Sequence, residues 1–164
     1  MNSINRLLAS LTVGGVVFVM GAIAQSAMAE DLVNFNGGIG VIPTGSANTT
    51  VRGVAAAGQI WVIRDLTADV DQGGRIRVDG KGLLLGAGDS VGGNANASVF
   101  ATLFCSNDGN VPHSSNAAGV PLQVNGDFSI DGRLSPAPPN TCTSPVLLIR
   151  SASSLGWFAA GIPE

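Results

Sequence analysis

The side chains that could do acid–base or nucleophilic chemistry are few, and only one of them is a histidine, His113. Ser114, Ser115 and Asp108 lie near it in the sequence, so the residue types of a Ser-His-Asp triad are present. A triad serine needs an oriented base and acid, and in many hydrolases it sits on a sharp strand-to-helix turn. The stretch around His113 is instead rich in glycine and asparagine. We therefore expect a solvated loop histidine and assign no catalytic residue here.

Residues 69–73 (DVDQG) begin like a calcium-binding loop. The resemblance ends there, because the fifth position is Gly73 and the twelfth, which should be a bidentate glutamate, is Gly80. Asp69 and Asp71 remain weak candidate ligands for calcium held in another geometry. The alternative is a solvated turn in which Asp69 pairs with Arg75. No other cofactor is indicated.

Two further arrangements could act on saccharides. Trp61 and Trp157, with Phe158, could provide a stacking surface for a sugar ring, although each lies in an apolar run where core packing is the favoured interpretation. Three aspartates expected at strand ends could form the carboxylate pair of a glycosidase if two of them lay roughly 5–10 Å apart in a cleft. These aspartates are Asp65, Asp79 and Asp131.

Cys105 and Cys142 are the only cysteines in the chain. In an exported protein an even number of cysteines predicts a disulfide, and two cysteines without neighbouring histidines make a poor metal site. The bridge would tie down residues 106–141, an irregular stretch, at both ends. Closing a loop of this length stabilises the fold by about 3–4 kcal/mol in the chain-entropy description.

The N-terminus has the three parts of a secretory signal. Residues 1–6 carry one positive charge, residues 7–24 have no charged side chain, and Ala27-Met28-Ala29 supplies the small-x-small pattern of a cleavage site. The alternative is an uncleaved membrane anchor, but the apolar stretch is short and contains three glycines. We predict that residues 1–29 are a signal peptide, and that residues 30–164 form a single domain that is secreted or periplasmic.

The net charge of the chain limits the classes of partner that it is expected to bind. The net charge of the full chain is −3, and Arg6 would leave with the signal peptide, which makes the exported part more acidic. A mildly acidic surface with a single lysine, Lys81, argues against nucleic acid as a partner, and against a membrane once the signal is removed.

The elements that must position these residues are expected to be strands. The sequence contains 23 glycines and 8 prolines, which break helices, and short β-branched and aromatic runs lie between them. This pattern predicts an all-β protein, a single antiparallel β-sandwich of seven to nine strands. The expected strands are residues 39–42, 50–54, 60–70, 74–85, 97–105, 120–124, 127–134, 145–150 and 155–162.

Three of the connections between these strands are expected to be hairpins. The first joins residues 60–70 to 74–85 through a turn at residues 71–73, with Leu66 opposite Val78, Ala68 opposite Ile76, and a bend near Gly80 and Gly82. The second crosses Asn125-Gly126, a strong hairpin signal, and the third joins the last two strands. The residues expected to point into the core are Leu66, Ala68, Ile76 and Val78, and those expected to point outward are Asp69, Arg75 and Arg77.

Several segments, taken in order, resemble a group of small exported bacterial proteins that have no assigned activity. The resemblance spans most of residues 41–163 and implies a bacterial origin and one exported β domain. It brings no functional residue with it. The segments are VRGV at 51–54, WVIRDL at 61–66, GRIRVDGKGLLL at 74–85, SVFATLFC at 98–105, NGDFSIDGRL at 125–134, PVLLIR at 145–150 and WFAAGIP at 157–163.

These observations favour an exported, non-enzymatic binding or structural module at the cell surface, in the periplasm or outside the cell, with an unidentified surface or extracellular ligand. One alternative is a secreted hydrolase that uses the aspartates, with glycans as candidate substrates. Another is a self-assembling surface or matrix protein that pairs through an edge strand, for which the terminal strands are the candidates.

Overall fold

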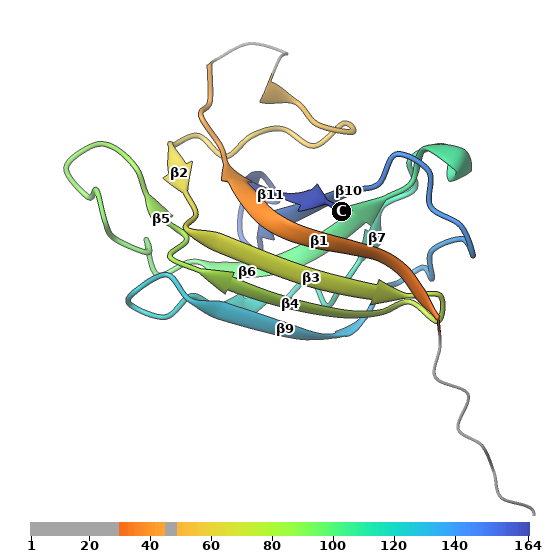
Figure 1. The fold of residues 1–164 in the computed structure, drawn as a ribbon. Coiled ribbons are helices and arrows are strands. Elements are labelled where there is room, and N and C mark those ends of the chain that lie inside the picture. Colours follow the sequence, from red (N-terminus) through yellow and green to blue (C-terminus); the bar gives the residue numbers. More distant parts are fainter. Residues whose placement is uncertain (1–29, 45–48) are drawn as a thin grey trace, which may run out of the picture.

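The structure, a computed structural model, describes residues 30–44 and 49–164. The expected signal peptide, residues 1–29, lies outside the described residues. Within them the protein is all-β, as predicted, and a short 3-10 turn, η2 (Ser106–Asp108), follows the sixth strand (Figure 1). No helix in the described part of the chain is long and apolar enough to cross a membrane. The strands in chain order are β1 (Asp31–Gly40), β2 (Trp61–Val62), β3 (Asp65–Asp71), β4 (Arg75–Lys81), β5 (Leu84–Leu85), β6 (Ser98–Phe104), β7 (His113–Ser114), β8 (Val120–Pro121), β9 (Phe128–Arg133), β10 (Val146–Ser151) and β11 (Trp157–Pro163).

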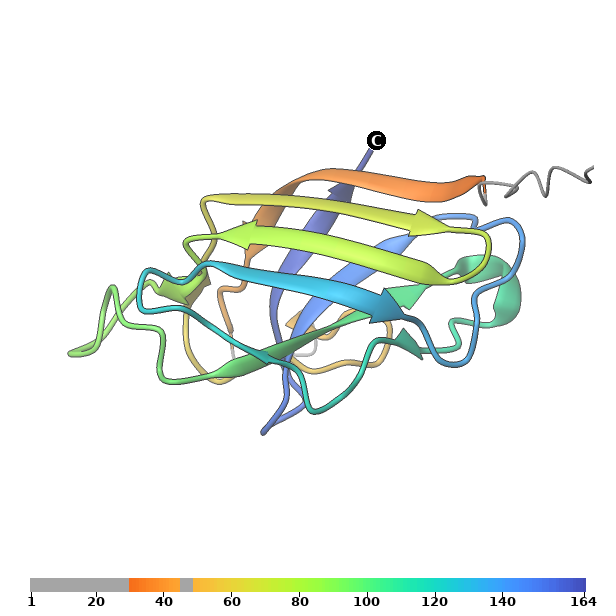
Figure 2. The same cartoon turned by 90° about the horizontal axis from the view of Figure 1, so that it is seen from below.

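Nine of the described strands form one sheet that is nearly closed. Its order is β7-β6-β10-β11-β1-β3-β4-β9, with β8 also pairing with β6, and β2 and β5 form a separate pair. The sheet curves so that its two ends approach each other (Figure 2). They meet at a backbone bridge, where the N–H of Ser135 donates to the carbonyl of Ser114 over 2.8 Å and the reverse bond is 3.2 Å. One continuous core therefore lies inside the curve.

The hairpin β3–β4 shows why one face of the sheet is buried and the other is exposed to solvent. Side chains alternate along a strand, and in both strands every second residue is buried while its neighbours are mostly exposed. The prediction of which residues point into the core is confirmed, as is the outward direction of the charged ones. The buried residues are Leu66, Ala68, Val70, Ile76 and Val78.

The predicted pairing within this hairpin is wrong by two residues. Leu66 lies opposite Gly80, and Ala68 lies opposite Val78. The reason is the turn: Gly74 has a φ of +77° and its N–H donates to the carbonyl of Asp71, so the loop is residues 72–74 instead of 71–73. A shift by two leaves every side chain on the same face, which is why the core prediction survived.

Each arm of this hairpin is shorter than predicted, because each predicted strand is divided into two: residues 60–70 contain β2 and β3, and residues 74–85 contain β4 and β5. Gly82, with a φ of +65°, ends β4, and beyond it β5 pairs with β2. Gly80 stays within β4, where a Cβ atom would collide with the ring of Phe128 on β9. The expected bend is therefore at Gly82, and Gly80 makes room for an aromatic ring.

Both faces of the β6–β10–β11 side are covered. Leu147, Leu148 and Ile149 are consecutive in β10 and all fully buried. On the outer face, residues 54–57 run beside β11, where the N–H of Ala57 donates to the carbonyl of Trp157 over 3.0 Å. The strand expected at residues 50–54 is instead a tight turn, which makes a covering segment for the sheet.

The second predicted hairpin is a turn whose two arms separate. Gly126 has a φ of +79° and the N–H of Gln123 donates to the carbonyl of Asp127, so the turn forms at the expected place. However, β8 pairs with β6, whereas β9 pairs with β4. The inward Phe128 packs over Gly80, and this fixes β9 beside β4.

The terminal strands lie inside the sheet, contrary to their expected place at its edges. β1 pairs with β3 on one side and with β11 on the other, and β11 also pairs with β10 as the predicted last hairpin. β1 begins well before the strand expected at residues 39–42. Its first part was not predicted because a bulge between Phe35 and Gly38 interrupts the alternation of its side chains. The free edge on the β4 side of the sheet belongs to β9.

Candidate functional site

A hollow of about 450 Å³ lies where three stretches of chain meet, and we call it the aromatic hollow. These stretches are residues 57–61, residues 95–98 and the β10–β11 turn. Trp61 and Phe158 line its base, with ring centroids 4.0 Å apart and planes inclined by 22°. None of the described residues that line it is charged. Its polar side chains are Gln59, Asn96, Ser98, Ser151, Ser153 and Ser154.

The rim of the aromatic hollow is held in shape by the β10–β11 turn. The buried hydroxyl of Ser151 accepts the backbone N–H groups of Ser153 and Ser154 over 3.3 and 3.2 Å. It also lies 3.0 Å from the hydroxyl of Ser153. Serine hydroxyls commonly organise turns in this way. The polar rim is therefore positioned before any ligand arrives.

A second hollow of about 310 Å³ adjoins the first, and we call it the alanine hollow. It is lined by residues 53–58 and 154–156 and by Arg150. The guanidinium of Arg150 donates to the carbonyl of Leu155 through two nitrogens, at 2.9 and 2.8 Å, and lies 5.1 Å from the ring centroid of Phe100. Two of its nitrogens thus hold the turn.

The two tryptophans singled out from the sequence have different surroundings. Trp61 is 3% exposed and Trp157 is 8% exposed, so neither presents an open ring face. The indole N–H of Trp157 donates to the carbonyl of Thr49 beneath the covering segment. Trp61 reaches the aromatic hollow, and its stacking partner is Phe158.

Asp69 and Asp71 lie on β3 and point to the outer side of the sheet. A carboxylate oxygen of Asp71 accepts the backbone N–H of Arg75 over 2.8 Å and so braces the turn. Asp69 lies opposite Arg77, and its expected partner Arg75 is bound elsewhere. Among the described residues no three His, Cys, Asp or Glu side chains gather around a point that could hold a metal ion. A calcium ion at Asp69 and Asp71 would therefore find no third His, Cys, Asp or Glu ligand among the described residues.

The three aspartates of the hydrolase alternative lie on the outward face of β3, β4 and β9. Asp65 lies opposite Lys81, and Asp131 accepts hydrogen bonds of 3.1 Å at both carboxylate oxygens from Arg75. Asp79 lies between hydroxyl residues of the neighbouring strands. The structure thus brings them onto one face, each beside a cation or a hydroxyl.

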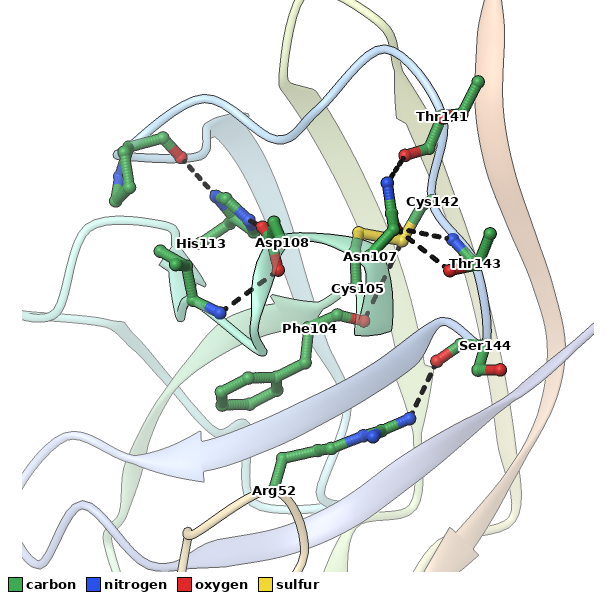
Figure 3. The surroundings of a disulfide bond; sticks show 12 residues. Arg52, Phe104, Cys105, Asn107, Asp108, His113, Thr141, Cys142, Thr143 and Ser144 are labelled. Atoms are coloured by element: carbon green, nitrogen blue, oxygen red, sulfur yellow. Dashed lines mark hydrogen bonds and ion pairs between the residues drawn. A yellow bond between two sulfur atoms is a disulfide. The ribbon is translucent and has the colours of Figure 1, made fainter.

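His113 is the largest departure from the sequence-based expectation. It is 3% exposed, it belongs to β7, and β7 pairs with β6. Its Nδ1 lies 2.9 Å from the carbonyl oxygen of Pro136 and its Nε2 lies 2.6 Å from a carboxylate oxygen of Asp108 (Figure 3). The expectation of a solvated loop histidine is wrong, because strand pairing draws the ring beneath residues 135–136.

Both ring nitrogens of His113 face oxygen atoms. A carbonyl oxygen only accepts, so Nδ1 donates to the carbonyl of Pro136. Burial alone would raise the pKa of Asp108, but the hydrogen bond and charge of His113 and the N–H of Val111 hold it below its usual value.

Neither Ser114 nor Ser115 is in place to use His113 as a base. The hydroxyl of Ser115 accepts the N–H of Ala101, and that of Ser114 lies 3.0 Å from the hydroxyl of Thr102. Both nitrogens of the ring are already bonded. The pair acts structurally and ties η2 to the connector that follows β9.

Cys105 and Cys142 form the predicted disulfide, with Cα atoms 4.9 Å apart (Figure 3). Sequence reasoning missed Asn107, which reinforces this crosslink. Its amide group donates to the carbonyl of Thr141 over 2.8 Å and accepts the N–H of Thr143 over 2.9 Å. The only available signal was an asparagine that follows a cysteine closely, which is too common to be informative.

Comparisons of this chain with protein-family models, with curated proteins and with solved structures find no match. The function is therefore inferred from the site itself.

Proposed function

We propose that this chain is an exported, non-enzymatic binding module that holds an uncharged, hydroxyl-rich ligand, a saccharide unit, in the aromatic hollow. One observation carries the proposal: a hollow with a stacked aromatic base has an uncharged rim of hydroxyl and amide groups. The hydroxyls of a saccharide exchange hydrogen bonds with serine, asparagine and glutamine side chains, and its C–H groups can rest on the apolar floor that the two nearly buried rings close. The volume, about 450 Å³, lies within the usual range for small-molecule sites.

Export is part of the same proposal. The sequence carries the features of a signal peptide, and the disulfide is compatible with an oxidising compartment outside the cytoplasm. We take residues 30–164 as one secreted or periplasmic domain of bacterial origin. We further propose that the curved sheet works as a β-sandwich, with β1–β3–β4–β9 as one layer and β6–β10–β11 as the other, because the inner residues of both are buried in one core.

The direct test is a binding titration of the exported form, residues 30–164, prepared with its disulfide intact. Tryptophan fluorescence and calorimetry would follow the addition of neutral saccharides, of uronic-acid and phosphorylated saccharides, and of peptides. We expect neutral saccharides to bind, and product analysis of the same mixtures separates binding from the hydrolase alternative. Preferential binding of the charged ligands would contradict the proposal.

A matched pair of variants locates the site. Ala152→Trp places a ring in the aromatic hollow, whereas Ala87→Trp adds the same ring at an exposed position elsewhere. We expect Ala152→Trp to abolish saccharide binding and Ala87→Trp to bind like the wild type. Equal affinities for the two variants would place the ligand somewhere else.

Self-assembly is a second candidate, favoured by the free edge of β9. Such an edge can pair with another strand. Size-exclusion chromatography over a range of concentrations tests it, and a monomer at high concentration would count against it.

A further inference from the structure

We infer that the aromatic hollow and the alanine hollow are neighbouring subsites of one groove, which binds a linear, neutral oligosaccharide along residues 53–59. This inference rests on the proposed function and specifies its ligand. The first support is continuity, because Ala57, Gly58 and Ser154 line both hollows. Only small residues, an alanine, a glycine and a serine, thus stand between the two hollows, and a ligand longer than one sugar unit could span both.

The backbone of this groove is prepared to hydrogen-bond a ligand. The N–H of Ala57 donates to the carbonyl of Trp157, and the N–H of Trp157 donates to the carbonyl of Ala55, over 3.0 and 3.1 Å. In this parallel bridge Trp157 is bonded to the residues on either side of Ala56. The N–H and C=O of Ala56 thus point away from β11, and among the described residues they have no hydrogen-bond partner. Ala56 lines the alanine hollow, so a donor and an acceptor are available there.

The groove selects against charge. None of the described residues that line the aromatic hollow is charged, and the alanine hollow has one charged lining residue, Arg150. That guanidinium is bonded to the carbonyl of Leu155 and packed over Phe100. In the aromatic hollow a uronic acid or a phosphate would lose part of its hydration and meet no cation, and in the alanine hollow the Nε and Nη2 donors of Arg150 are already bonded to Leu155. The ligand class is therefore a neutral glycan chain.

The test uses homologous series of neutral saccharides with the exported form of the protein. Cello-, malto- and chito-oligosaccharides from one unit to six would be titrated by calorimetry. For the series that binds, we expect affinity to rise at least about tenfold between the shortest ligand that binds and one long enough to fill both hollows, and then to level off. Equal affinity at every length would overturn the groove and leave the proposed function standing. If no saccharide of any series binds, both are overturned.

Variants separate the two subsites. Ala55 is exposed and lines only the alanine hollow of the two. Ala55→Trp should bind the shortest ligand like the wild type but lose the gain with length, whereas Ala152→Trp should lose both. Ala55→Lys, which places a charge in the same hollow, should behave like Ala55→Trp and covers the case in which the larger ring disturbs folding. A full gain with length in both Ala55 variants would contradict the inference, and Ala87→Trp is the control.

Discussion

The bond between His113 and Asp108 makes stability depend on pH in a defined direction. The folded state holds the pKa of Asp108 below its usual value, so the stabilisation from its ionised form is complete above the unfolded value of about 4. It is lost as the pH falls through the lowered folded value. Asp108→Asn removes this titration. We expect urea unfolding from pH 6 downward to show an acid-induced loss in the wild type that is smaller in the variant, and parallel curves would contradict the assignment.

Val78 and Arg77 are neighbours in β4 with opposite environments. Val78 is 1% exposed, so Val78→Asp buries a carboxylate without a partner and should lower the free energy of unfolding by several kcal/mol, roughly 3–5. The side chain of Arg77 is 60% exposed and lies 4.0 Å from a carboxylate of Asp131. Arg77→Ala should therefore cost at most about 0.5 kcal/mol. Equal melting temperatures for the two variants would show that the inward and outward faces are misassigned.

At the residue scale, the type of a side chain was enough to single out candidate residues. Contacts with residues distant in the sequence could not be predicted. Trp61 was a candidate for a sugar site because of its type, but nothing local indicates that Phe158 stacks on it. The three serines at 151–154 lie in the turn between the last two strands, and nothing local indicates that all three line the aromatic hollow. His113 was assigned to solvent because its buried partner, the carbonyl of Pro136, lies far along the sequence.

At the element scale, β9 has three consecutive unpaired positions along its free edge. The N–H of Leu134 donates to Gly74 in continuation of the β9–β4 pairing, so even-numbered residues direct their backbone groups to β4 and odd-numbered residues direct theirs outward. Asp127 and Ser135 find partners across the gap. The described structure provides none for the outward backbone groups of Ser129, Asp131 and Arg133.

Amide hydrogen exchange measured by NMR would test this alternation. The amides of Ser129, Asp131 and Arg133 should exchange fast, while those of Ile130 and Gly132 should be protected. Slow exchange of the first set at low protein concentration would contradict the pattern. Protection that appears only as the concentration rises would instead support self-assembly through this edge.

The disulfide should stabilise the fold without being required for the sheet. Replacing Cys105 and Cys142 by serine should lower the free energy of unfolding by about 2–4 kcal/mol and leave the circular dichroism of the β-sheet intact. Residues 106–141 were expected to loosen as a whole, but β9 within them is paired with β4. We therefore expect limited proteolysis to cut first at residues 136–141. First cuts within β9, or two free thiols in the exported wild type, would contradict this account.

The elements themselves were predicted better than their partners. Alternation indicates which face of a strand is buried, and so the inward set of β3 and β4 was correct although the register was off by two. The register depends on which residue takes the left-handed conformation in the turn, here Gly74. Pairings such as β1 with β11 and β4 with β9 join distant segments, and nothing in either segment alone marks the partner.

At the scale of the whole molecule, charge is distributed unevenly. The outward faces of β3, β4 and β9 carry most of their residues as aspartate, arginine or lysine, whereas residues 53–59 and the β10–β11 turn carry no charged side chain. A face with charges of both signs favours solubility. Under the proposed function, recognition would rest on shape and hydrogen bonds. This separation could not be predicted, because it arises from the way in which the sheet curves.

The central pairing of β1 with β11 means that the last strand completes the sheet. A chain truncated after Gly156 would lack β11, and both β1 and β10 would lose a partner. We expect such a chain to be unfolded or aggregated, as judged by circular dichroism and light scattering, whereas removal of Glu164 alone should be tolerated. A folded monomer from the truncated chain would show that the sheet can close without β11.

A chain that leaves the cytoplasm with its N-terminus first would release β1 early. One neighbour of β1 in the sheet, β11, would follow only at the very end. Until Trp157–Pro163 have crossed, β1 and β10 both lack their shared neighbour β11, so the sheet of an exported chain would stay incomplete within the export channel. Contacts between distant segments form slowly, and until they form the unpaired strand edges are open to aggregation. If the chain is exported as proposed, the position of this one strand would make translocation precede folding.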